Sequence, residues 1–246
     1  MTSKSEKRSG IILNTRPPIY RDRFHTAFAA IGLPIVDCPA LATSASGHAV
    51  PDAADFDAVI FTSQVGVGSF PPRPDWTSKR VYAVGPGTED AAVQAGYANV
   101  VRTGLNAKDM VEKLWHEDFR KALYVSGEDV TTDLSVEMPG RVQRFIAYRT
   151  APNSELPSQA MLPIKSSAVA IAPLFSRRSA QAFAGMLDGA DVTAEIAAVG
   201  ISDDVFANGE GPWHCRAAAD APTLESMVTK VREVAKDMNL TAEDAP

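Results

Sequence analysis

The sequence carries one arrangement of strand and helix patterns twice. The stretch "DFDAVIFTSQVGVGSF" (55–70) has the same layout as "SSAVAIAPLFSRRSAQAF" (166–183), and "VYAVGPGTED" (81–90) has the same layout as "IAAVGISDD" (196–204). The copies are offset by about 110 residues, which indicates two similar lobes of roughly that size. Clefts between two such lobes are the usual places for ligands.

Within each copy, short apolar runs alternate with segments of helical periodicity. Strands that are buried on both faces read as continuous apolar runs, and their alternation with helices indicates a parallel sheet. The sequence therefore predicts two α/β lobes, each a parallel sheet flanked by helices. Up to residue 150, the expected strands are 11–14, 33–38, 58–62, 81–84, 99–102, 122–126 and 142–150, and the expected helices are 21–30, 64–69, 88–95 and 107–117. We expect a polar tail over residues 1–9 and a loop over residues 43–51.

Composition argues against several functional classes. The chain has 24 Lys and Arg against 30 Asp and Glu, a net charge of −6, whereas nucleic-acid binding needs clustered cations. No apolar stretch approaches the roughly 18 residues of a membrane span, and the four histidines show no metal-ligand spacing. Cys38 and Cys215 form no CxxC motif, which favours a reducing compartment. We therefore expect a cytoplasmic protein with no metal and no nucleic-acid or membrane partner.

A glycine turn follows the apolar run that ends at Val84. Gly85 and Gly87 fit the first part of the dinucleotide-binding pattern G-x-G-x-x-G, but Asp90 occupies the third glycine position. The corresponding turn of the repeat keeps only Gly200, and no Walker motif is present. A nucleotide site therefore has little support, although such a turn still presents backbone N–H groups at a helix end that favours anions.

Several strand-to-helix turns of this kind carry small polar residues. They contain Thr62 and Ser63, Gly85 to Thr88, Ser126 and Gly127, Ser176, and Gly200 to Ser202. One interpretation is that these serines and threonines only cap helices. The other is that turns from two facing lobes together bind a ligand with many anionic arms.

The order of several short motifs resembles the uroporphyrinogen-III synthase family. The motifs are "NTRPP", "VIFTS", "VGPGT", "AGY", "YVSGE", "AYRT" and a second "AVG" turn followed by "APT", and they span about residues 10–235. The resemblance implies two lobes joined by a two-stranded linker, with a cleft between them. It also implies an enzyme of haem and porphyrin biosynthesis, a cyclising hydro-lyase without cofactor or metal. Such an enzyme closes hydroxymethylbilane, a linear tetrapyrrole with eight carboxylates, to uroporphyrinogen III, with loss of water and inversion of the last pyrrole ring.

The resemblance also changes the expected domain boundaries. The repeat alone divides the chain near residue 120, whereas lobes in this family are interleaved. The expected division is lobe 1, residues 1–38 plus 152–246; lobe 2, residues 41–147; and crossings at about 39–40 and 148–151. Prolines mark both crossings as extended segments, and we expect a monomer.

Tyr148 is the candidate catalytic residue, because it matches the tyrosine to which catalysis in this family is ascribed. A phenol O–H can act as general acid toward the departing bilane hydroxyl, although an amphipathic tyrosine is also common at a strand edge. Arg16 and Arg177 are candidates for pairing with substrate carboxylates or, alternatively, for surface salt bridges. The substrate-binding candidates are Thr15, Arg16, Ser63, Gly85, Thr88, Ser126, Gly127, Ser176, Arg177 and Ser202.

Three features depart from the family pattern. Pro173 is expected to interrupt the strand before Ser176, and "PPRPDW" shortens the helix after Ser63. Asp203 and Asp204 would repel a polyanion at the second glycine turn. Three alternatives therefore stay open. They are a low-activity family member, a non-catalytic two-lobed protein that binds a small anion, and a nucleotide- or sugar-using transferase.

Overall fold

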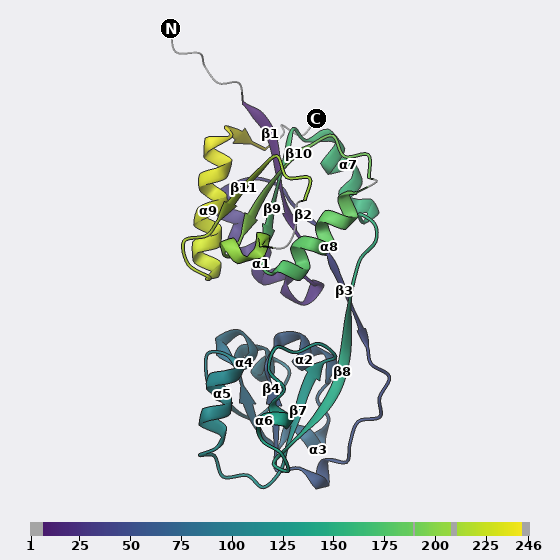
Figure 1. The fold of residues 1–246 in the computed structure, drawn as a ribbon, viewed down its shortest axis with the longest axis vertical. Coiled ribbons are helices and arrows are strands. Elements are labelled where there is room, and N and C mark those ends of the chain that lie inside the picture. Colours follow the sequence, from purple (N-terminus) through teal and green to yellow (C-terminus); the bar gives the residue numbers. More distant parts are fainter. Residues whose placement is uncertain (1–6, 189, 208–210, 243–246) are drawn as a thin grey trace. The chain divides into compact units, whose positions relative to one another are not determined.

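The chain divides into two compact units in the computed structural model, which describes residues 7–188, 190–207 and 211–242. Unit 1 comprises Met1–Ala42 and Ala151–Pro246, and unit 2 comprises Thr43–Thr150. Each unit is built on one sheet of mostly parallel strands flanked by helices, as the sequence predicts (Figure 1). Most of the expected polar tail, residues 1–6, lies outside the described residues. Arg8 and Ser9, which were also expected in that tail, form the start of the first strand.

Unit 1 contains one six-stranded sheet. Its elements are β1 (Arg8–Asn14), η1 (Pro18–Tyr20), α1 (Arg21–Phe28), η2 (Ala29–Ile31), β2 (Ile35–Asp37), α7 (Ser158–Ser166), β9 (Val169–Leu174), α8 (Arg177–Leu187), β10 (Glu195–Gly200), η4 (Asp203–Phe206), β11 (Cys215–Ala218), α9 (Leu224–Asp237) and β12 (Leu240–Thr241). The strand order is β11-β10-β9-β1-β12, and β2 also pairs with β1. All these pairs are parallel.

Helices cover both faces of this sheet, and β9 shows why its sequence is continuously apolar. Ala170, Ala172 and Leu174 pack into a cluster with α7 and α8, whereas Val169 and Ile171 pack with α1 and α9. Successive strand residues point to opposite faces, so a strand covered on both sides needs apolar residues at every position.

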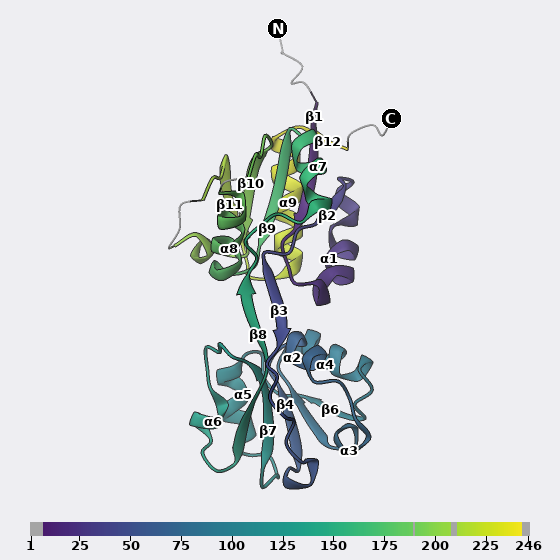
Figure 2. The same ribbon diagram turned by 90° about the vertical axis from the view of Figure 1, so that its right-hand side faces the viewer.

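Unit 2 repeats this plan. Its elements are η3 (Ala53–Asp55), β4 (Ala58–Phe61), α2 (Gln64–Ser69), α3 (Pro74–Thr77), β5 (Arg80–Ala83), α4 (Gly85–Gln94), β6 (Asn99–Arg102), α5 (Ala107–Leu114), β7 (Ala122–Gly127) and α6 (Leu134–Glu137). Two further strands, β3 (Leu41–Ala45) and β8 (Val142–Pro152), complete its sheet. The strand order is β3-β8-β7-β4-β5-β6, and the pairs from β8 to β6 are parallel. Val59 and Phe61 of β4 pack with α2 and α4, while Ile60 packs with α5 and α6 on the other face. Figure 2 shows α2 and α4 on one side of this sheet and α5 and α6 on the other.

The chain passes between the units through two paired strands, β3 (Leu41–Ala45) and β8 (Val142–Pro152). The unit boundaries fall within these strands, after Ala42 and after Thr150. The expected loop over residues 43–51 is therefore wrong at its start, because Thr43–Ala45 belongs to β3. Only the first residue of β3 is buried, so backbone pairing holds this strand and no apolar pattern marks it.

Two further expectations about local structure are wrong. Pro173 does not interrupt its strand but lies inside β9, paired with Val199 of β10. Helix α4 begins at Gly85 rather than at Thr88, because Gly85 and Pro86 supply its first turn. Proline is well tolerated there, since the first N–H groups of a helix have no partner within it. Among the described helices, none has both the length and the apolar character needed to cross a membrane.

Candidate functional site

The sheet of unit 2 reverses its strand order between β4 and β7. From β4 the chain builds β5 and β6 on one side, and then returns to build β7 and β8 on the other. In open α/β sheets, ligands bind beyond the carboxyl ends of the strands at such a switch point. A hollow of about 340 Å³ lies there, and its lining includes Thr62, Ser63, Tyr124, Gly127 and Tyr148.

The hydroxyl of Tyr148 faces that of Ser63 in this hollow. Their oxygens are 3.1 Å apart, and Ser63 Oγ also accepts the backbone N–H of Gly66 at 3.0 Å as the N-cap of α2. Ser63 therefore serves as a helix cap and as a tyrosine partner at once. If its proton goes to the Tyr148 oxygen, the phenol O–H is left to donate elsewhere.

Gly127 makes room for the Tyr148 ring. A Cβ at this position would lie 2.7 Å from Tyr148 Cε2 and 2.8 Å from Cζ, far closer than van der Waals contact. The register between β7 and β8 shifts between Ser126 and Gly127, so that Gly127 pairs with Tyr148 while Ser126 pairs with Ile146. This irregularity places the phenol over the glycine.

A second tyrosine lines the hollow and was not singled out from the sequence. The hydroxyl oxygen of Tyr124 lies 3.3 Å from Thr62 Oγ1, so Thr62 and Ser63 each face one tyrosine. Burial raises the pKa of Tyr124, which keeps this phenol protonated. The available signal was its position in β7, two residues before the Ser126 turn.

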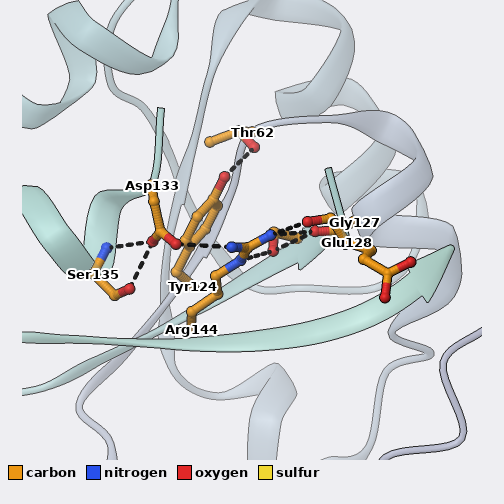
Figure 3. A network of polar contacts seen from close by, with 8 residues as sticks. Thr62, Tyr124, Gly127, Glu128, Asp133, Ser135 and Arg144 are labelled. Carbon is orange, nitrogen blue, oxygen red and sulfur yellow. Dashed lines mark hydrogen bonds and ion pairs between the residues drawn. The ribbon is translucent and has the colours of Figure 1, made fainter. Parts of the chain in front are cut away.

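Arg144 was also missed, and it holds the segment that follows β7. Its guanidinium donates to Ser126 Oγ (2.9 Å), to the carbonyl oxygens of Gly127 (2.8 Å) and Glu128 (2.5 Å), and to Asp133 Oδ2 (2.8 Å) (Figure 3). The Ser126 hydroxyl, a predicted substrate contact, is thus used within the protein. It accepts from Arg144 and donates to the Gly127 carbonyl at 2.9 Å.

The glycine turn at the start of α4 is held by backbone contacts. Gly85 has φ +68°, and its N–H donates to the Gly104 carbonyl at 3.1 Å. A positive φ of this size favours glycine. Thr88 is buried within the first turn of α4, outside the lining of the hollow. It therefore does not occupy the cap position that one of the two interpretations gave it.

Unit 1 has the corresponding switch point between β1 and β9, because β2 and β10 lie on opposite sides of this pair. Thr15 follows β1, is 1% exposed, and donates through Oγ1 to the Pro173 carbonyl at 2.8 Å. This hydroxyl fastens β1 to β9 rather than facing solvent. Pro173 therefore contributes a carbonyl acceptor at the switch point.

Arg16 comes next in the chain and lies between two aromatic rings. Its guanidinium carbon is 3.7 Å from the ring centroid of Tyr20 and 4.3 Å from that of Phe175. Among the described residues, no carboxylate forms an ion pair with Arg16, and Arg23 is a charged neighbour. Burial lowers the pKa of Arg16 from its ordinary value. The arrangement presents a desolvated cation suited to an external anion.

Two of the three remaining candidates of unit 1, Ser176 and Arg177, have side-chain partners within the protein. Ser176 caps α8 in a reciprocal pair with Ser179, whose N–H donates to Ser176 Oγ at 3.1 Å. Arg177 forms a two-point ion pair with the carboxylate of Asp204. Ser202 is at the N-cap of η4, where its side chain makes no capping hydrogen bond. The repulsion expected from Asp204 is therefore offset by Arg177.

Five of the predicted residues thus form two groups, one in each unit. Ser63, Gly127 and Tyr148 meet in the hollow of unit 2, and Thr15 and Arg16 lie at the switch point of unit 1. Within the described ranges, no cluster of three His, Cys, Asp or Glu side chains is arranged to hold a metal. Burial raises the pKa of Cys38 to about 12, which makes its thiol a poor nucleophile at neutral pH.

Comparison with known proteins gives consistent results. A family model described as uroporphyrinogen-III synthase HemD matches residues 22–229, and no curated protein matches the sequence. A uroporphyrinogen-III synthetase from Helicobacter pylori is similar in structure, with a TM-score of 0.62, 14% identity, and coverage of 92% of this chain and 99% of that one. A mutant uroporphyrinogen III synthase from the extremely thermophilic bacterium Thermus thermophilus gives a TM-score of 0.46, 14% identity, and coverage of 93% and 99%. The first similarity supports the two-domain α/β fold.

Proposed function

Because the chain belongs to the uroporphyrinogen-III synthase family, we propose that it closes hydroxymethylbilane by dehydration, with the Tyr148 hydroxyl as general acid. The family membership identifies an enzyme of haem biosynthesis whose substrate is a small tetrapyrrole. The position of Tyr148 supports this role: its hydroxyl lines a hollow at a topological switch point and faces Ser63 at 3.1 Å.

The proposed chemistry gives separate roles to the hydroxyl groups of Tyr148 and Ser63. Tyr148 donates to the bilane hydroxyl as its C–O bond breaks, so that water leaves while a pyrrole N–H proton is lost and an azafulvene forms. Ser63 keeps the phenol oriented, and its own hydroxyl stabilises the phenolate until Tyr148 is reprotonated. The substituted carbon of the last ring then attacks the electrophile and forms a spiro intermediate. The bond from this carbon to the methylene bridge of the third ring breaks, and the freed methylene closes onto the unsubstituted α-carbon of the last ring, which loses its proton; the ring is thereby inverted. The protein promotes this step by holding the folded bilane in position.

Binding of the substrate carboxylates is assigned first to Arg16. A guanidinium that is stacked on two rings and lacks a carboxylate partner among the described residues is ready for a bidentate pair with an incoming carboxylate. Arg177 is a secondary candidate because Asp204 already neutralises it. The helix starts at Ser63 and Ser176 are further candidates for anion contacts, because the N-terminal end of a helix favours negative charge.

We also propose that the two units are the two lobes of the enzyme and that it works as a cytoplasmic monomer. The unit boundaries lie within a few residues of the expected crossings. Cys38 and Cys215 are both free thiols, which supports a reducing compartment.

The test is to incubate the purified protein with hydroxymethylbilane and to separate the two uroporphyrinogen isomers that form. Isomer III has the inverted last ring, whereas isomer I is the uninverted product of spontaneous closure. Formation of isomer III above the enzyme-free blank supports the proposed reaction. Binding of the bilane without isomer III would favour a non-catalytic anion-binding protein. Slow formation of isomer III would identify a low-activity family member.

A further inference from the structure

We propose that Arg144 is a positioning residue that fixes one wall of the Tyr148 hollow, an inference that rests on the proposed function of that hollow. The wall is the segment of residues 128–133 between β7 and α6, which we call the wall segment. Asp129, Val130, Thr131 and Thr132 of this segment line the hollow. They come from a stretch without helix or strand structure.

Arg144 contacts the wall segment at both of its ends. One side of the guanidinium donates to the Gly127 and Glu128 carbonyls at 2.8 and 2.5 Å, and the other donates to Asp133 Oδ2 at 2.8 Å (Figure 3). Asp133 in turn accepts from the N–H and Oγ of Ser135, at 3.0 and 2.6 Å, at the start of α6. A single planar group thus ties both ends of the wall segment, which restricts its conformational freedom.

The anchor and the proposed acid are on the same strand. Arg144 and Tyr148 both belong to β8, and Gly127 is at once a hydrogen-bond partner of Arg144 and the pairing residue of Tyr148. The side chain of Arg144 is only 19% exposed and that of Asp133 only 25%. The strand that carries the phenol therefore also sets the position of the wall that faces the substrate.

Arg149 offers a matched comparison within the same strand. Its Nε lies 3.3 Å from Glu128 Oε1, so it also contacts the wall segment, but its side chain is 52% exposed. An exposed pair of this kind contributes little to a fixed geometry. Replacing either arginine by methionine removes one charge. Arg149→Met removes the contact with Glu128, whereas Arg144→Met removes contacts at both ends of the wall segment.

The experiment compares wild type, Arg144→Met, Arg144→Lys and Arg149→Met. Backbone amide exchange of residues 128–133 is measured on the free protein, and KM, kcat and the ratio of isomers III and I are measured with hydroxymethylbilane. For Arg144→Met we expect amide exchange to be at least about tenfold faster in the wall segment and to stay slow in β4 and β7. We also expect kcat/KM to fall by about 10- to 100-fold, mainly because KM rises. Arg149→Met should stay within about twofold of wild type in these measurements.

The Arg144→Lys variant distinguishes an effect on the position of the wall segment from an effect on the stability of the protein. Lysine keeps the charge opposite Asp133 but cannot reach both ends of the wall segment with one nitrogen. We expect it to restore folding if Arg144→Met folds poorly, while KM stays raised. A wild-type KM and isomer ratio in either folded Arg144 variant would overturn the inference. If wild type itself forms no isomer III, the proposed function fails instead, and the positioning role with it.

Discussion

The hydroxyls of Tyr148 and Ser63 lie 3.1 Å apart although 85 residues separate them in the sequence. The strand order brings them together, because β4, which precedes Ser63, and β8, which carries Tyr148, both flank β7. Gly127 at the end of β7 has no side chain to separate them. This contact places a phenol at the switch point of unit 2, and the following predictions test what the phenol and its neighbours do.

Tyr148→Phe keeps the ring but removes the hydroxyl. We expect the rate of isomer III formation to fall by about 10²-fold, the lower end for general acid catalysis. The thermal unfolding midpoint should barely change, because the ring supplies most of the packing. Isomer I, the product of spontaneous closure, should increase as the enzyme slows. An unchanged isomer III rate in the folded variant would remove Tyr148 from the mechanism.

Tyr82→Phe is the matched control for this change. The Tyr82 hydroxyl donates to Glu117 Oε2 at 3.0 Å, and Tyr82 is not part of the lining of the hollow. Its loss should cost about 1 kcal/mol of unfolding free energy and leave the isomer III rate of the folded protein unchanged. Equal losses of activity in both variants would point to a general effect of removing a buried phenol hydroxyl.

Gly127→Ala should displace the Tyr148 ring. The new methyl group would lie 2.7 Å from Cε2, so we expect a loss of about 1–3 kcal/mol in unfolding free energy, typical of overpacking. Activity should fall with it, and the double variant with Tyr148→Phe should be no slower than Tyr148→Phe alone, since both act on one hydroxyl. Gly185→Ala, where a Cβ meets open space in α8, should be neutral or stabilising. Multiplicative rate losses in the double variant would contradict this explanation.

Arg16→Met should weaken substrate binding more than Arg177→Met. A charge-assisted pair with a carboxylate contributes about 1.5–3 kcal/mol, so we expect KM to rise about 10- to 100-fold for Arg16→Met, with kcat changed less. Arg177 is already paired with Asp204, and its loss should change KM by less than about threefold. A larger KM effect at Arg177 would reverse the assignment. Unfolding curves of both variants provide the check that each is folded.

The lowered pKa of Asp133 leads to a prediction of how the wall segment responds to acid. Burial alone would raise the pKa of Asp133, but hydrogen bonds from Ser135 and Arg144 outweigh it, so the pKa is lowered. A lowered pKa means that the contact stabilises the folded protein above the ordinary value of about 3.9 and is lost as pH falls through the lowered value. After correction for intrinsic rates, amide protection of residues 128–133 should persist from pH 7 to about pH 4. Loss of amide protection near pH 6 would contradict this prediction. So would a loss of protection in acid that occurs at the same pH in wild type and in Asp133→Asn.

The strands of the fold could be predicted from the sequence because burial on both faces leaves a direct signal. "AVIF" at Ala58–Phe61 is buried at every position, and its neighbours in the sheet show similar runs. Strand β3 leaves no such signal, since four of its five residues are exposed and its partner β8 lies far away in the chain. The start of α4 was misplaced because Gly85 and Pro86 were interpreted as a turn before the helix rather than its first residues.

The candidate site was only partly accessible from sequence. Ser63, Gly127 and Tyr148 could be singled out one by one from turns and from the family resemblance, but their mutual contact depends on the register shift after Ser126. Arg144 gave no signal, because its four acceptors lie at the end of β7 and at the two ends of the wall segment, whose path the sequence does not show. Positions of this kind become visible only when the strand register and the loop path are known.

The measurement that tests the central claim most directly is the ratio of isomers III and I formed from fresh hydroxymethylbilane at increasing concentrations of wild type and of Tyr148→Phe. Wild type should convert the bilane to isomer III almost completely once the enzymatic rate exceeds the spontaneous one. Tyr148→Phe should need about 10²-fold more protein to reach the same ratio. Isomer I alone at every concentration of folded wild type would contradict the proposed reaction, and coincident curves for the two proteins would contradict the role of the Tyr148 hydroxyl.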